Sequence, residues 1–118
     1  MKGYKKAITT AMITFSSKAN SVLLGEGLIN AGRIYDTLNG VPANKCIEFP
    51  IAENLIMGSA IGLAIQGYRP LVIFQRMDFM TCAMDAIINH LAIIPQMSGY
   101  RIKLPVIIRA IVGSQALS

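Results

Sequence analysis

The segment from Phe49 to Asp85 holds the side chains of this sequence that are best placed to do chemistry. One acid, Glu53, begins an otherwise uncharged helical stretch, and Phe79 follows an Arg-Met-Asp patch after the next apolar run. A helix N-terminus favours a charged carboxylate, whereas an apolar cleft favours the neutral form, and a carboxyl group under both influences can relay a proton. The pattern is therefore typical of a cofactor-binding site. Glu53 could equally be an ordinary first-turn acid, and Phe79 could be a core aromatic.

Helix and strand patterns alternate along the chain and would position these residues. The apolar spacing predicts helices over 3–18, 53–66 and 79–94, the second buried on most sides and the third ended or kinked by Pro95. Short apolar runs predict buried strands at 22–24, 46–49, 71–74 and 105–112, with 28–42 as loop or weak helix. This order predicts an α/β fold with a parallel sheet, helices on both faces and no domain boundary within residues 1–118.

In a parallel sheet, ligands bind beyond the carboxyl ends of the strands. The predicted strand ends lead into the segments Gly25 to Gly27, Pro50 to Glu53, Gln75 to Phe79 and Gly113 to Gln115. Glu26 and Gln75 should therefore lie at the same edge as Glu53. The sequence has no Ser-His-acid arrangement, no P-loop and no GxGxxG, which argues against nucleophilic hydrolysis and dinucleotide binding.

The composition describes one domain with little polar surface. The 118 residues are 53% hydrophobic, so we expect part of the apolar surface to meet another chain. The net charge of +5 is scattered and forms no stripe, which argues against nucleic acid as a partner. Lys2, Lys5 and Lys6 are interpreted as a solvated helix face, and we expect neither a transmembrane helix nor a membrane partner.

The two cysteines, Cys46 and Cys82, and the single histidine, His90, lack the spacing of a metal site. We expect no metal ligands in this chain, two small buried thiols and a buried or interface histidine. Unpaired thiols and the absence of a signal-peptide pattern predict a cytoplasmic location.

Three stretches carry a resemblance to a known family. They are VLLGEGLIN, then FPIAENLIMGSAIGLAIQGYRPLVIFQRMDFMTCAMDAIIN, and then MSG with LPVIIRAIVG. Together they cover nearly the whole chain and resemble the beta subunit of the decarboxylase component of 2-oxo acid dehydrogenase complexes. More broadly, the chain is similar to the pyrimidine-binding domain of transketolase-like thiamine diphosphate enzymes.

This resemblance implies roles for five residues. The acid matching Glu53 hydrogen-bonds the aminopyrimidine ring of thiamine diphosphate and promotes the imino tautomer that removes the thiazolium proton. Phe79 matches the aromatic side chain that stacks on the pyrimidine, and Ile51 and Gln75 match positions that line the same pocket. Glu26 matches an acid near the subunit contact and is expected to have a supporting role.

The resemblance also implies partners. In the family, an alpha subunit with a Gly-Asp-Gly signature holds the diphosphate and Mg²⁺, and this sequence has no such signature. The chain should then offer half of a site in a heterotetramer that serves an acyltransferase core. Pyruvate, branched-chain 2-oxo acids and acetoin all remain open as substrates. Relatives continue beyond the final GSQALS, so the chain is expected to be truncated.

Two alternatives remain open. The chain could belong to a ketol-transferring, transketolase-like enzyme, although those chains place the diphosphate domain before this one. It could also be a truncated interaction module without catalytic activity. Pro95 and the apolar stretch 91–94 depart from the family pattern. An incomplete sheet with a free edge also predicts self-association.

Overall fold

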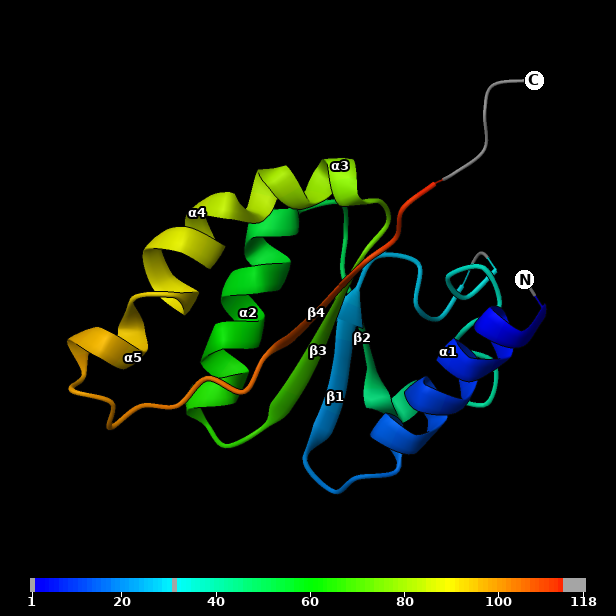
Figure 1. Cartoon of the computed structure of the whole chain (residues 1–118), viewed down its shortest axis with the longest axis horizontal. Helices are drawn as coiled ribbons and strands as arrows, with labels where there is room; N and C mark the ends of the chain where they lie inside the picture. Colours follow the sequence, from blue (N-terminus) through cyan, green and yellow to red (C-terminus); the bar gives the residue numbers. More distant parts are fainter. Residues whose placement is uncertain (1, 31, 114–118) are drawn as a thin grey trace.

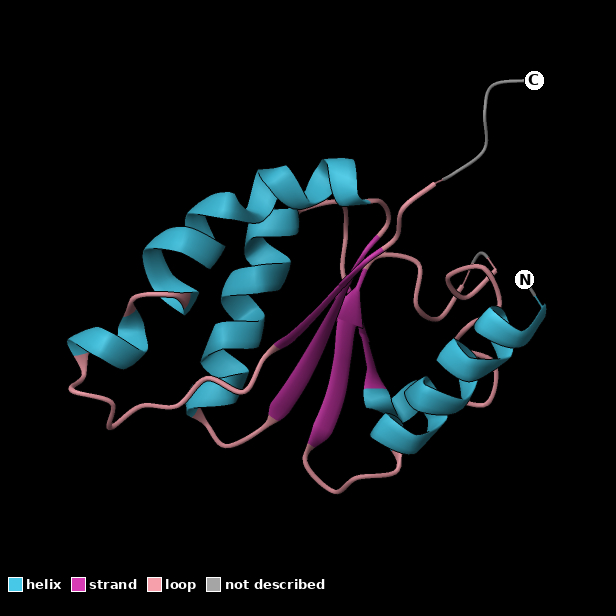
Figure 2. Cartoon of the chain, in the orientation of Figure 1, coloured by secondary structure: helices cyan, strands magenta, loops and turns pink. Residues whose placement is uncertain are grey.

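A computed structural model describes residues 2–30 and 32–113 of the chain. Its centre is a four-stranded sheet with the order β2-β1-β3-β4, in which every neighbouring pair is parallel (Figures 1 and 2). The strands are β1 (Ser21–Gly25), β2 (Cys46–Glu48), β3 (Arg69–Phe74) and β4 (Ile107–Ala110). The predicted parallel sheet is confirmed, and residues 114 and 115 of the predicted final loop lie outside the described residues.

The sheet is covered on both faces because successive residues of a strand point to opposite sides. Leu23 and Leu71 join one core with helix α1 (Lys2–Ser16), whereas Leu24 and Val72 join a second core with helix α2 (Glu53–Ile65). Figure 1 shows α1 on one side of the sheet and α2 with the later helices on the other. The helices on both faces are therefore also confirmed.

Helix α2 was predicted to be buried on most sides, and in this chain that prediction is wrong. Five of its residues are buried, namely Ile56, Met57, Ala60, Ile61 and Ala64. Leu55, Gly58, Gly62 and Ile65 are exposed. The described residues cover one side of the helix only, so its apolar outer face lies open to solvent.

The helical segment from Met77 to Met97 was predicted as one helix over 79–94 but changes its winding several times. It consists of α3 (Met77–Met80), the 3₁₀ turn η2 (Thr81–Ala83), α4 (Met84–Ala86), the π-helical turn η3 (Ile87–Leu91) and α5 (Ile94–Met97). The backbone N–H of Ala86 donates to Oδ1 of Asn54 on α2 at 3.0 Å, just before the π-helical turn. A side chain that enters the helix ladder is a usual cause of such irregularity. Pro95 lies in the first turn of α5, where its missing N–H is tolerated.

One further property of this segment bears on membranes. By length and composition alone, Met77–Met97 is apolar enough to cross a bilayer, a test that core helices of soluble proteins also pass. The expected absence of a membrane partner therefore stays a prediction.

The connection from β1 to β2 contains a left-handed turn. All five residues of the range 32–36 have positive φ, from 40° to 75°, and four of them are not glycine. Left-handed backbone is costly for such residues, so other contacts must stabilise it. Asp36 N–H donates to Gly32 O at 2.8 Å, and the Arg33 side chain donates to the carbonyls of Leu28 and Val41 at 3.1 and 2.9 Å. The described residues 28–30 and 32–42 thus form a loop without a right-handed helix.

Strand β4 was predicted to be buried, but its four residues are half-buried or exposed because it forms an edge of the sheet. Arg109 interrupts its apolar run. The Nη2 group of Arg109 donates to Thr37 Oγ1 at 2.9 Å, whereas Nη1 is buried without an acceptor among the described residues. Burial lowers the pKa of Arg109 below its ordinary value.

The two cysteines lie in different environments. Cys46 is buried, as predicted, but the same prediction is wrong for Cys82, which is exposed. In the turn η2 the neighbouring Ala83 takes the inward position and Cys82 faces outward. His90 is also exposed, with its Nε2 atom 3.8 Å from Oδ2 of Asp85, so it is not a buried histidine in this chain.

Candidate functional site

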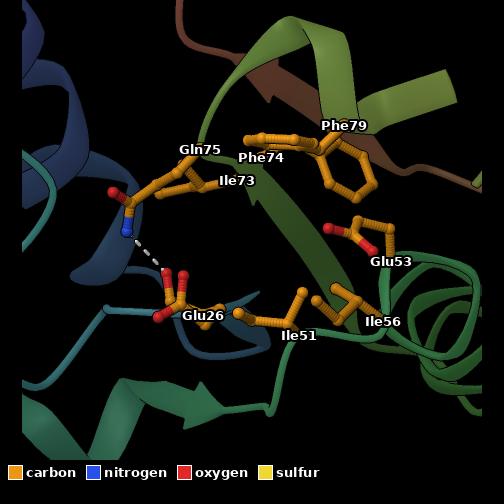
Figure 3. A pocket seen from close by; sticks show the side chains of 8 residues that line it. All are labelled: Glu26, Ile51, Glu53, Ile56, Ile73, Phe74, Gln75 and Phe79. Carbon is orange, nitrogen blue, oxygen red and sulfur yellow. Dashed lines mark hydrogen bonds between the residues drawn. The ribbon is translucent and has the colours of Figure 1, made fainter. Parts of the chain in front are cut away.

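A pocket of about 330 Å³ lies at the carboxyl ends of β1 and β3 (Figure 3). The chain runs from β1 to β2 on one side and then crosses to β3 on the other side of β1. This is the point where the strand order reverses, and loops there diverge and leave a crevice. The sheet topology therefore favours this place as a candidate ligand site.

All five residues that the sequence nominated line this one pocket: Glu26, Ile51, Glu53, Gln75 and Phe79. Glu26, Ile51 and Gln75 follow the ends of three different strands, Glu53 begins α2, and Phe79 lies in α3 (Met77–Met80). The pocket also contains Ile56, Ile73 and Phe74, which the sequence did not nominate. Their signal was available: Ile73 and Phe74 are the last residues of a continuous apolar strand, and Ile56 lies three residues after Glu53 on a helix.

Glu53 is the first residue of α2 and is half-buried. The residue before it, Ala52, has extended φ and cannot cap the helix with its side chain. Figure 3 shows the Glu53 carboxylate on the same side of the pocket as the Phe79 ring. The helix start thus delivers a carboxylate into a pocket whose walls are mostly apolar.

The pocket is open on one side. Ile51 is 80% exposed and Phe79 is 49% exposed, although both line the cavity. The open side therefore has room for a flat molecule or for another protein surface, next to an exposed aromatic ring, an exposed isoleucine and a carboxylate.

The loop that carries Glu26 approaches β3 very closely. A Cβ atom at Gly25 would lie 2.7 Å from Ile73 O, and one at Gly27 would lie 2.3 Å from Gln75 Nε2. Gly27 also has φ of +78°. Glycine is therefore required by space at Gly25, where the close atom is a backbone oxygen, and by conformation at Gly27, where the close atom belongs to a flexible side chain. Gln75 Nε2 donates to Glu26 O at 2.8 Å and joins the loop to the end of β3.

Sequence reasoning missed Glu48, the last residue of β2. Its two carboxylate oxygens each accept a backbone N–H, from Gly27 and Leu28, both at 3.0 Å. The contact joins residues about twenty positions apart, and the acid follows no catalytic spacing. Its only signal was its place at a strand end.

The charge at the pocket is negative. Its lining includes the carboxylates of Glu26 and Glu53 and no Lys or Arg. The nearby Arg76 is paired with Asp78 at 2.6 Å, and this hydrogen bond raises the pKa of Arg76 above its usual value. Among the described residues, no three His, Cys, Asp or Glu side chains gather as metal ligands would.

The family model described as "Transketolase, pyrimidine binding domain" matches residues 1–116. The chain belongs to this family.

The transketolase pyrimidine-binding domain of this chain is similar to several beta subunits. It is 34% identical over 91 residues to a pyruvate dehydrogenase E1 component subunit beta of Gracilaria tenuistipitata var. liui, which covers 74% of this chain. It is 30% identical to the beta subunit of an acetoin:2,6-dichlorophenolindophenol oxidoreductase of Cupriavidus necator, covering 79%, and 29% identical to the beta subunit of a 3-methyl-2-oxobutanoate dehydrogenase of Mycobacterium tuberculosis, covering 88%. The matches span 28% to 31% of these relatives' own length.

Proposed function

We propose that this chain supplies the pyrimidine-activating half of a thiamine diphosphate site, as a beta-type subunit in the oxidative decarboxylation of a 2-oxo acid. The observation that carries the proposal is the convergence of Glu53, Phe79, Gln75, Ile51 and Glu26 on one pocket at the reversal of strand order. Membership of the pyrimidine-binding family supports it.

The donor set of the pocket fits an aminopyrimidine. Such a ring is flat and apolar on its faces and carries hydrogen-bonding nitrogens at its edge. The pocket offers an aromatic ring and isoleucine side chains for the faces, and a carboxylate and an amide for the edge. When bound, thiamine diphosphate would supply a thiazolium carbon that can act as a nucleophile on a 2-oxo acid.

The residues of this chain would then have separate tasks. Glu53 would share a proton with a ring nitrogen, which requires a carboxylate at a fixed position in an apolar setting. Phe79 and Ile51 would hold the ring between them and exclude water. Gln75 would orient the ring edge while it holds the Glu26 loop through its Nε2 group.

The same pocket is unsuited to a diphosphate. Two carboxylates and no cationic side chain line it, so a diphosphate placed there would be repelled. We therefore propose that an alpha subunit holds the diphosphate with Mg²⁺ and closes the exposed side of the pocket. The complex would be a heterotetramer of alpha and beta chains that passes its product to an acyltransferase core.

The names of the relatives suggest three substrate classes, namely pyruvate, acetoin and branched-chain 2-oxo acids. Nothing in the pocket of this chain selects among them, since its lining would contact the cofactor rather than an acyl group. The two free thiols are compatible with a reducing compartment, and we propose the cytoplasm.

The proposal is tested by reconstitution. The chain is combined with alpha subunits of pyruvate, acetoin and branched-chain enzymes, and decarboxylation is followed with thiamine diphosphate and Mg²⁺. In a productive pair, Glu53→Gln should lower kcat by about 10² to 10⁴-fold, the usual contribution of positioned proton transfer.

The matched control is Asp85→Asn, an acid-to-amide change at an exposed carboxylate that does not line the pocket. It should leave the rate within about twofold of the wild type. Equal rates for the wild type and Glu53→Gln would overturn the role of Glu53. Activity in ketol transfer alone would favour the transketolase-like alternative, and alpha-subunit binding without any turnover would favour a non-catalytic module.

A further inference from the structure

Glu48 holds the backbone of the Glu26 loop by both of its carboxylate oxygens. Oε1 accepts the N–H of Gly27 and Oε2 accepts the N–H of Leu28, each at 3.0 Å. Hydrogen bonds from backbone N–H groups to an ionised carboxylate are stronger than those to a neutral acceptor. Two consecutive N–H groups bound by one carboxylate fix both the position and the direction of the loop.

The loop is held from the opposite side as well. Gln75, at the end of β3, donates to Glu26 O at 2.8 Å, and β1 and β2 pair in register up to Gly25 and Glu48. The backbone of residues 25–28 is therefore bound between the ends of the two strands that flank β1. Among the groups that bind this loop, namely the Glu48 carboxylate, the Gln75 amide and the strand backbone, only the Glu48 side chain carries a full charge.

Glu48 does not line the pocket, but Glu26, in the loop that Glu48 binds, does line it. Figure 3 shows Glu26 and Gln75 across the pocket from Glu53. We propose that Glu48 is a positioning residue of the thiamine diphosphate site, which sets the Glu26 loop so that the pocket keeps its width and its second carboxylate opposite Glu53. This inference rests on the function proposed above.

The chemistry of the contact makes an isosteric test possible. Glu48→Gln keeps the shape of the side chain but replaces one acceptor oxygen by an NH₂ group, which would face a backbone N–H as donor against donor. Glu48→Asp keeps both oxygens on a side chain that is shorter by one methylene. The aspartate variant should therefore retain more of the function than the glutamine variant.

The experiment uses the full chain in complex with the productive alpha subunit and measures kcat, the apparent KM for thiamine diphosphate and the melting temperature. Because small misplacements in an active site can cost up to about 10²-fold, we expect Glu48→Gln to lower kcat over this KM by about 10 to 100-fold. Glu48→Asp should recover part of the loss. Hydrogen exchange on the free chain should show faster exchange of the Gly27 and Leu28 amides in Glu48→Gln.

Ser98→Ala is the matched control for a purely structural effect. The Ser98 hydroxyl also makes two hydrogen bonds to backbone, accepting from Ile102 N at 3.0 Å and donating to Pro95 O at 2.9 Å, in a turn that does not line the pocket. It should lower the melting temperature without changing the KM for the cofactor.

Each outcome decides the matter. Equal kinetic effects of Glu48→Gln and Ser98→Ala, or wild-type kinetics in Glu48→Gln, would overturn the positioning role while Glu53→Gln still reports on the proposed function. Unchanged exchange at Gly27 and Leu28 would overturn the clamp itself. A wild-type complex that decarboxylates no 2-oxo acid would overturn the proposed function, and the role of Glu48 with it.

Discussion

Cys46 and Cys82 differ in accessibility, and this difference gives a prediction at the residue scale. Burial raises the pKa of the Cys46 thiol, while the charge and hydrogen bond of Arg33 oppose the shift with smaller effect. A raised pKa means less thiolate at a given pH, so Cys46 should react with Ellman's reagent more slowly than the exposed Cys82. Labelling of Cys46 should become comparable only as the pH rises through the raised pKa or after unfolding in urea.

Two variants assign the phases of that labelling experiment. Cys82→Ser should remove the fast phase, and Cys46→Ala should remove the slow one. Two thiols that react at one common rate in the native protein would contradict the buried position of Cys46.

Single residues also show which parts of the candidate site could be predicted from the sequence. Glu53 and Phe79 could be nominated as pocket residues because an isolated acid at a helix start and an aromatic after a strand are visible without coordinates, and both line the pocket. Their roles came from the family resemblance and stay a prediction. Glu48 could not be nominated in this way, because its partners are backbone N–H groups of a distant loop, and the residue type alone does not indicate such a contact. The exposure of Cys82 was missed because it depends on which side of a 3₁₀ turn faces the core.

At the scale of elements, α2 and the Met77–Met97 segment pack through apolar side chains and are also joined by a side-chain hydrogen bond. The Asn54 side chain accepts the Ala86 N–H at 3.0 Å. Asn54→Ala removes the acceptor and leaves a partly buried N–H unpaired, so the free energy of unfolding should fall by about 1–3 kcal/mol. Urea denaturation measures the change, and hydrogen exchange at the Ala86 amide should become faster.

Asn89→Ala is the control for this prediction. It removes an exposed hydrogen bond of similar length, 2.9 Å to Asp85, on the same helical segment. Its effect should stay within about 0.5 kcal/mol, as is usual for surface substitutions. Equal losses in the two variants would show that the Asn54 contact has no special importance.

The period of apolar residues was sufficient to predict the elements but not their irregularities. Helices α1 and α2 and strand β3 lie within a few residues of their predicted ranges, because each has a clear apolar period or run and a definite end. The 3₁₀ and π-helical turns were missed because tertiary contacts cause them. The left-handed turn at 32–36 was missed for the same reason, since Arg33, Ile34 and Tyr35 have no local preference for positive φ.

At the scale of the whole molecule, large apolar side chains are exposed on the helices that cover one side of the sheet. Leu55 on α2 is 55% exposed, Ile88 on η3 is 53% exposed and Met97 on α5 is 79% exposed. Such a surface is unfavourable in water unless another chain covers it. We therefore expect the isolated chain to self-associate, with a mass that rises with concentration in size-exclusion chromatography coupled to light scattering.

A charge placed on this surface should oppose association. Leu55→Lys should shift the population toward monomer, whereas Tyr4→Lys, at a 73% exposed position on α1 across the sheet, should not. A monomer at every concentration would contradict the prediction. The alpha subunit is then added to the self-associated chain. If a mixed complex replaces the self-associated form, the same surface binds both another copy of this chain and the alpha subunit.

The all-parallel sheet also constrains how this chain can acquire its structure. No two of the four described strands are joined by a hairpin, and even the partners nearest in sequence, such as Leu23 and Cys46, are 23 positions apart. Every pairing must close a long loop before it gains a contact, which is the condition for slow folding. During synthesis on the ribosome, β1 must therefore wait for both β2 and β3 to emerge before it can form either of its pairings.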